Sequence, residues 1–145
     1  MSEKIRILFL CTGNSARSQM AEALLLKLAG NRFEVFSAGL EPKSVHPLTI
    51  TALQEIGIDW SKARSKSLNE FLGKTHFGYL ITVCSRAEEK CPIFPGNGQR
   101  LHWPFDDPAA VLGSEEDQLA AFRSVRDQIE VKILAWLQSQ GVNQP

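Results

Sequence analysis

The residues best suited to chemistry in this chain are its three cysteines, Cys11, Cys84 and Cys91. Cys11 opens the segment CTGNSARS, in which five residues separate it from Arg17. A cysteine thiolate is a strong nucleophile, and a guanidinium can hold two oxygens of a tetrahedral oxyanion at once. This spacing predicts a nucleophile held inside an anion-binding loop.

The residues around Cys11 favour such a loop. An apolar strand predicted from Lys4 to Leu10 leads into it and a predicted helix leaves it, so backbone N–H groups and a helix N-terminus would face an anion. We expect Gly13 to permit a turn that a side chain would obstruct, and Ser18 to donate a hydrogen bond to the Cys11 sulfur. An inert cysteine buried at a strand end is the simpler alternative. The predicted oxyanion-binding residues are Thr12, Gly13, Asn14, Ser15, Ala16, Arg17 and Ser18.

The other two cysteines lie close together in the sequence. Cys84 directly follows a predicted strand, which places it at the same sheet edge as Cys11, and Cys91 comes seven residues later across the polar stretch SRAEEK. Each could be a small buried apolar residue. We predict a redox role, because both lie in the one segment that could face Cys11 and an odd number of cysteines does not suit a structural disulfide framework.

Predicted strands and helices alternate along the 145 residues. This order predicts one α/β domain over residues 1–145, an open parallel four-stranded sheet with helices on both faces. The predicted strands are 4–10, 33–37, 78–83 and 100–103. The predicted helices are 17–30, 47–56, a short one from Leu68, and a last one between Ser114 and Gly141.

The composition narrows the class of protein. Sixteen basic and sixteen acidic residues give a formal net charge of zero, so no global attraction to nucleic acid or to an anionic membrane follows. No apolar run approaches the ~18 residues of a membrane span, and the N-terminus lacks a secretory cleavage site. We expect a cytoplasmic monomer. The three histidines show no metal-ligand spacing, so we expect neither a metal nor a cofactor.

The motifs together resemble a known family. The segment CTGNSARSQMAEALL resembles the start of the low-molecular-weight protein tyrosine phosphatase fold, and more narrowly of the thioredoxin-coupled arsenate reductases built on it. Three further segments extend the resemblance over nearly the whole chain: SAG at Ser37, VCSRAEEKCP at Val83 and HWPFDDP at His102.

The resemblance implies a function and a role for each residue. It implies reduction of arsenate to arsenite with Cys11 as nucleophile, Cys84 and then Cys91 as resolving cysteines, and thioredoxin as reductant. Glutaredoxin stays open as the reductant. The aspartate before proline is the general acid of this fold, which by position is Asp107; the alternative is a simple Asp-Pro turn. A disulfide between Cys84 and Cys91 implies that the region from Cys84 to Pro95 changes conformation.

Two other functions use the same residues. A phosphatase would hydrolyse phosphate monoesters through a Cys11 phosphoenzyme, but phosphatases of this fold often carry tyrosines where this chain has Ala109 and Ala110. A non-enzymatic oxyanion or redox sensor would need no general acid, so Asp107 argues against it.

One departure from similar sequences concerns a cation. Some similar reductases bind potassium behind the loop through an Asn, a Glu, a Ser and an Asp. Asn14, Glu22 and Ser37 match the first three, whereas the fourth position is Lys66. Because an ammonium repels a cation, we predict no potassium site, with the ammonium in that space and Asn14 stiffening the loop.

Overall fold

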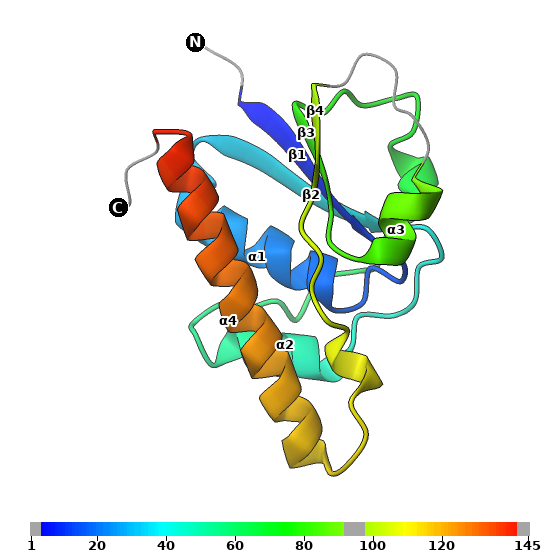
Figure 1. Cartoon of the computed structure of the whole chain (residues 1–145), viewed down its shortest axis with the longest axis vertical. Coiled ribbons are helices and arrows are strands. Elements are labelled where there is room, and N and C mark those ends of the chain that lie inside the picture. The colour runs from blue at the N-terminus through cyan, green and yellow to red at the C-terminus, as the bar shows by residue number, and fades with distance from the viewer. Residues whose placement is uncertain (1–3, 92–97, 142–145) are drawn as a thin grey trace.

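The computed structural model describes residues 4–91 and 98–141. Its core is a parallel sheet in the order β2-β1-β3-β4 (Figure 1). The strands are β1 (Ile5–Cys11), β2 (Phe33–Gly39), β3 (Tyr79–Thr82) and β4 (Gln99–His102). The predicted open four-stranded parallel sheet is confirmed. Each predicted strand is present, with ends that differ by at most two residues.

Within residues 4–91 and 98–141, four α-helices and two short 3₁₀ helices connect and follow the strands. They are α1 (Arg17–Ala29), α2 (Pro47–Gln54), α3 (Ser85–Lys90), α4 (Glu115–Ser139), η1 (Leu68–Glu70) and η2 (Pro108–Ala110). Ser67 and Ser114 each accept a bond from the following turn and form the capping boxes that their spacing predicts. Within the described residues, no helix has the length and apolar character needed to span a bilayer.

The two faces of the sheet are covered by different segments. On one face, Phe9 of β1 packs against Trp103, which packs in turn against Trp136 of α4. On the other face, Phe36 of β2 packs against Phe71 and Phe77, which follow η1. Because both faces are covered, Ile7–Leu10 are wholly buried, which accounts for the unbroken apolar run of β1.

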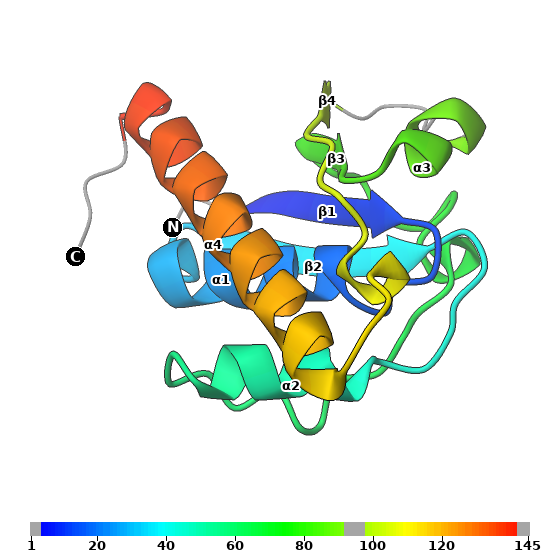
Figure 2. The same ribbon diagram turned by 60° about the horizontal axis from the view of Figure 1, so that its bottom comes forward.

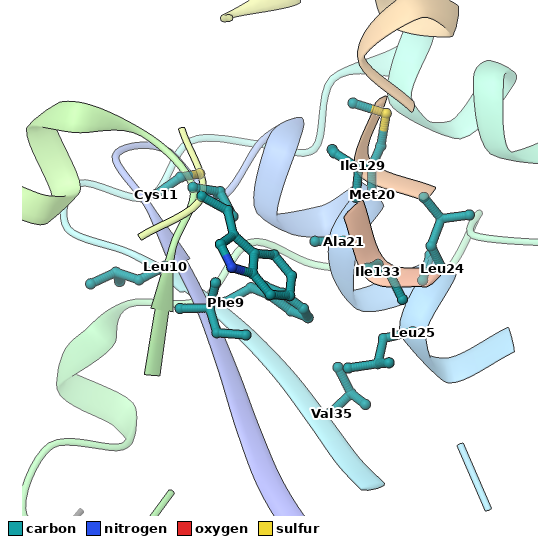
Figure 3. Close-up of a cluster of buried hydrophobic side chains, with 14 of the residues drawn as sticks. Phe9, Leu10, Cys11, Met20, Ala21, Leu24, Leu25, Val35, Ile129 and Ile133 are labelled. Carbon is teal, nitrogen blue, oxygen red and sulfur yellow. The ribbon is translucent and has the colours of Figure 1, made fainter. Parts of the chain in front are cut away.

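The main core lies between the sheet, α1 and α4. Figure 3 shows Met20 and Leu24 of α1 beside Ile129 and Ile133 of α4, with Phe9 of strand β1 on the side of the sheet. All five side chains are wholly buried, and burial of each such side chain contributes about 1.5–3 kcal/mol. This packing fixes α1 against β1, and therefore fixes the loop that joins them.

The topology brings two chain segments to one edge of the sheet. Strands β1 and β3 are neighbours and parallel, with Leu10 opposite Thr82, so both carboxyl ends lie at the same edge. Helix α3 starts directly after β3 and lies beside these ends (Figures 1 and 2). This confirms that Cys84 lies at the same sheet edge as Cys11.

Candidate active site

A pocket of about 550 Å³ opens at this edge of the sheet. It brings together the four predicted catalytic residues nearest the loop, which are Cys11, Arg17, Cys84 and Asp107. The rest of its lining is Thr12, Gly13, Ser15, Ala16, Lys43, Ser85, Arg86, Phe105, Asp106 and Ala109. A single pocket therefore holds two sulfurs, cationic side chains and carboxyl groups.

Cys11 lies almost buried at the end of β1, with its Sγ 2.9 Å from the Oγ of Ser18. The Ser18 oxygen also accepts a bond of 2.8 Å from Asn14 Nδ2. This second bond leaves the Ser18 hydroxyl hydrogen free to point at the sulfur. The predicted Ser18 contact is present, and it would stabilise a Cys11 thiolate.

Asn14 holds the loop from behind. Its backbone has a positive φ of 49°, a conformation that Asn tolerates better than most residues. Its Nδ2 donates to Ser18 and to Ser37 (2.8 and 2.9 Å), while its Oδ1 accepts from Gln19 Nε2 and from the Lys66 backbone N–H. Every polar atom of this buried amide is thus used to stiffen the loop. The Asn14 side chain therefore supports the loop, and only its backbone could contact an anion.

The glycine that the loop requires is Gly39, and the expectation for Gly13 was wrong. A Cβ on Gly13 would meet no atom closer than 3.6 Å, the Cδ of Lys43. A Cβ on Gly39 would lie 2.8 Å from the Thr12 carbonyl oxygen and 2.9 Å from the Asn14 nitrogen. The end of β2 passes so close to the loop that only glycine fits there.

Backbone N–H groups and Arg17 are the donors available at the predicted anion site. In residues 4–91 and 98–141, no backbone N–H from Gly13 to Arg17 donates to a protein acceptor, and Ala16 provides no side-chain cap for α1. Arg17 donates from Nη1 to the Phe105 carbonyl at 3.1 Å. That contact holds the guanidinium at the pocket, where the N-terminus of α1 also favours negative charge.

Asp107 lies on the pocket wall near Arg17, half exposed. Its Oδ2 is 3.8 Å from Arg17 Nη2, and its Oδ1 accepts from the Ala109 N–H at 3.0 Å. The Asp-Pro turn considered from the sequence is therefore present, at the start of η2. One carboxyl oxygen caps the turn while the other lies toward Arg17, so the turn leaves an oxygen available for the predicted acid role.

Cys84 and Cys91 lie at opposite ends of α3, and no disulfide joins any of the three cysteines. The Cys84 sulfur is buried, accepts from the Ala87 N–H at 3.4 Å and lies 3.5 Å from Thr12 Oγ1. Cys91 is half-buried, and burial raises the pKa of its thiol above the usual value. The expected conformational region ends at Pro95, which lies outside the described residues.

Behind the loop, the ammonium group of Lys66 lies near the carboxylate of Glu22. Lys66 Nζ lies 3.6 Å from Glu22 Oε1, which also accepts from Ser37 Oγ at 2.5 Å. Burial raises the pKa of Glu22, although the attraction of Lys66 opposes that shift. The position expected for the ammonium is therefore confirmed. Within the described ranges, no group of three His, Cys, Asp or Glu side chains is arranged to hold a metal.

Several residues of the site escaped the sequence analysis. Gln19 braces Asn14 and accepts from Trp60 Nε1, and Ser65 donates to the Asn14 carbonyl. Lys43 and Arg86 lie on the pocket wall. Each is a common polar residue in a segment without a recognisable motif, so only the folded arrangement could identify it.

Comparison with known proteins agrees with this geometry. The family model for low molecular weight phosphotyrosine protein phosphatase matches residues 6–144. The chain belongs to this family. Within it, an arsenate reductase of Halalkalibacterium halodurans is 46% identical over 134 residues, which cover 92% of this chain and 94% of that protein.

Solved structures of the family's fold lead to the same group of relatives. An arsenate reductase in the phosphate binding state matches with a TM-score of 0.75 and 28% identity, covering 93% of this chain and 98% of that one. The thioredoxin-dependent arsenate reductase of Corynebacterium glutamicum matches with a TM-score of 0.67 and 31% identity, covering 96% of this chain and 64% of that one. The phosphatase family therefore includes reductases, and the second sulfur in this pocket, Cys84, is a group that ester hydrolysis does not require.

Proposed function

We propose that this chain reduces arsenate to arsenite, using Cys11, Cys84 and Cys91 in turn. The observation that carries the proposal is the position of Cys84, whose sulfur lines the same pocket as Cys11 and Arg17. Relatives more than 40% identical over about nine-tenths of the chain are arsenate reductases, which supports the same activity.

The first step forms a bond between sulfur and arsenic. The loop N–H groups and Arg17 hold the arsenate oxygens, and the Cys11 thiolate attacks arsenic. Asp107 protonates a hydroxyl group of arsenate, the bond between that oxygen and arsenic breaks, and the oxygen departs as water. Arsenic stays pentavalent in this step.

The second step is the reduction itself. The Cys84 thiolate attacks the Cys11 sulfur, the new S–S bond forms, and the S–As bond breaks with its electron pair left on arsenic. Arsenic becomes trivalent and leaves as arsenite. Thr12 Oγ1 and the Ala87 N–H, both close to the Cys84 sulfur, are positioned to stabilise its thiolate before the attack.

The last steps restore the enzyme. Cys91 attacks the Cys84 sulfur, which releases Cys11 as a thiolate and leaves a Cys84–Cys91 disulfide. A thioredoxin dithiol then reduces that disulfide. The similar protein of Corynebacterium glutamicum is described as thioredoxin-dependent, which supports this reductant. Thioredoxin keeps thiols reduced in the cytosol, so we also propose a cytoplasmic location.

The test measures arsenate-dependent consumption of NADPH by thioredoxin reductase, thioredoxin and the chain. We expect turnover in the wild type, and less than about one-hundredth of it in Cys11→Ser, Cys84→Ser and Cys91→Ser. The Cys84→Ser protein should still bind arsenate, which serves as its folding control. Undiminished turnover in both Cys84→Ser and Cys91→Ser would reject the relay.

Hydrolysis of phosphate monoesters is the second candidate. The loop, Arg17 and Asp107 suffice for a Cys11 phosphoenzyme, and the family model is that of a phosphatase. Ala109 lines the pocket wall and offers no ring to stack on an aryl group. We therefore propose slow aryl phosphate hydrolysis that requires Cys11 and is retained in Cys84→Ser. Aryl phosphate turnover faster than arsenate turnover would reverse the ranking.

A further inference from the structure

Helix α3 stands between the two resolving sulfurs. Cys84 is its N-cap and Cys91 its C-cap, seven residues apart. At a rise of 1.5 Å per residue their Cα atoms are roughly 10 Å apart along the axis, whereas a disulfide needs about 4.4–6.8 Å. If the proposed relay is right, α3 must unwind for Cys91 to reach Cys84, and whatever holds α3 in place controls that step.

The strongest polar attachment of α3 to the sheet is the Glu88 carboxylate. Thr82 of β3 donates its hydroxyl to Glu88 Oε2. Arg100 of β4 lies 2.9 Å from Glu88 Oε1, and the same Nη2 donates to the Glu88 backbone carbonyl at 2.6 Å. His102 Nδ1 lies 3.4 Å from Oε2 and 2.8 Å from Thr82 Oγ1. One side chain thus joins α3 to two neighbouring strands.

The cluster is partly protected from water. The side chains of Glu88, Arg100 and His102 are each about one-third exposed, at 32–35%, and Thr82 is wholly buried. Contacts shielded in this way keep more of their strength than contacts between fully exposed charges. Arg100 also donates a hydrogen bond to the Glu88 carbonyl near the C-terminal end of α3. Backbone acceptors at this end of a helix have no partner within the helix. Glu88 is therefore joined both by its side chain and by its backbone.

Cys84 provides another attachment of α3, which the proposed chemistry weakens. In this structure the Cys84 sulfur accepts from the Ala87 N–H and so caps the helix. Once that sulfur is bonded to Cys11, it is drawn into the pocket and the cap weakens. Of the polar side-chain contacts that tie α3 to other segments in the described residues, the Glu88 contacts and the Arg86–Glu41 ion pair then remain, and the Glu88 contacts are the less exposed of the two.

We propose that Glu88 is a positioning residue which, through Thr82, Arg100 and His102, holds α3 as a helix and keeps Cys91 away from Cys84. Release of these contacts lets Cys91 reach the Cys84 sulfur. In that exchange the Cys84–Cys91 bond forms, the Cys11–Cys84 bond breaks, and Cys11 leaves as a thiolate, so no electrons are gained or lost. The Glu88 contacts stabilise the dithiol form relative to the Cys84–Cys91 disulfide.

The test compares Glu88→Gln with Glu89→Gln in the full chain. Both substitutions remove one charge from α3 at nearly equal helix propensity, and Glu89 is exposed. A Cys11→Ser background leaves one cysteine pair to titrate in dithiothreitol redox buffers. We expect Glu88→Gln to raise the equilibrium constant for the Cys84–Cys91 disulfide about three- to tenfold, and Glu89→Gln to change it by less than about twofold.

A second variant and a second readout complete the test. Arg100→Gln should shift the equilibrium in the same direction, and adding it to Glu88→Gln should give less than the sum of the two effects. In a Cys11→Ser, Cys84→Ser background, Glu88→Gln should speed alkylation of Cys91 by iodoacetamide. Equal redox equilibria for Glu88→Gln and Glu89→Gln would overturn the proposal. Arsenate turnover of the wild-type chain is measured separately, so failure of the proposed function would be recognised on its own.

Discussion

The hydroxyl oxygen of Thr12 lies 3.5 Å from the sulfur of Cys84, although Cys84 comes 72 residues later in the chain. Thr12 follows β1 and Cys84 follows β3, and the parallel pairing of these strands brings both to one edge. The contact joins the oxyanion loop to the segment that carries the second sulfur. A hydroxyl at this distance can donate to a thiolate and is lost on substitution by an isosteric apolar residue.

Thr12→Val should therefore slow the step in which Cys84 attacks. We expect a single turnover of arsenate to slow about tenfold, because a charge-assisted hydrogen bond contributes about 1.5 kcal/mol or more. Aryl phosphate hydrolysis does not need Cys84 and should slow less than arsenate turnover, because Val keeps the backbone N–H at this position of the pocket. Rapid-quench measurement of arsenite supplies the rate. Thr51→Val is the control, since its hydroxyl donates to the Pro47 carbonyl within α2. Equal rates for the two variants would contradict the role of Thr12.

Asp107→Asn should impair both arsenate reduction and phosphate hydrolysis. The amide cannot protonate a departing oxygen, so kcat should fall about 10²-fold or more with little change in KM. The turn should survive, because an Asn oxygen can still accept from the Ala109 N–H. Asp106→Asn serves as the matched control, and steady-state kinetics supply the measurement. A larger loss in Asp106→Asn than in Asp107→Asn would reassign the acid.

Lys43 should assist binding of the anion without taking part in its chemistry. Its aliphatic stem lies over Gly13 and the side chain lines the pocket, while its backbone N–H donates to the Gly13 carbonyl. Lys43→Gln should raise the KM for arsenate several-fold and leave kcat within about twofold. The difference should shrink in high salt, because the side chain is exposed and its charge is screened. Lys74→Gln, on an exposed loop, is the control, and an unchanged KM in Lys43→Gln would refute the prediction.

The elements, and the side chains that meet in the pocket, were predictable because each leaves a local signal. The apolar run of β1, the capping boxes at Ser67 and Ser114, and the Cys11–Arg17 spacing are all short-range patterns. Cys84 could be placed because it directly follows a strand of a parallel sheet.

Contacts between distant segments could not be predicted in this way. Gly13 was expected to be the essential glycine, because it lies inside the motif, but the close approach of β2 makes Gly39 essential instead. His102 contacts Thr82 and faces Glu88, and no pattern in the sequence indicated either partner. Such relationships depend on the register between strands and on side-chain direction, which a single sequence does not encode in any short pattern.

Lys66→Met should destabilise the fold, and the loss should depend on pH. The Lys66 and Glu22 side chains are only 15% and 13% exposed, so removing the ammonium leaves a buried carboxylate without its ion-pair partner, at a cost of about 3 kcal/mol.

The dependence of this loss on pH follows from Glu22. Burial already raises the pKa of Glu22 in the wild type and Lys66 opposes that shift, so the Lys66→Met substitution should raise the pKa of Glu22 further. Because the pKa of Glu22 is higher in the folded chain than in the unfolded chain, the unfolded chain loses this proton first as the pH rises. The free energy of unfolding is therefore greatest at a pH below the pKa of Glu22 in the unfolded chain, and it falls as the pH rises through the pKa in the folded chain. The variant should thus lose more stability at pH 8 than at pH 5. Urea unfolding at both pH values measures this, with Lys62→Met as the exposed control; equal losses at the two pH values would show that Glu22 does not depend on Lys66.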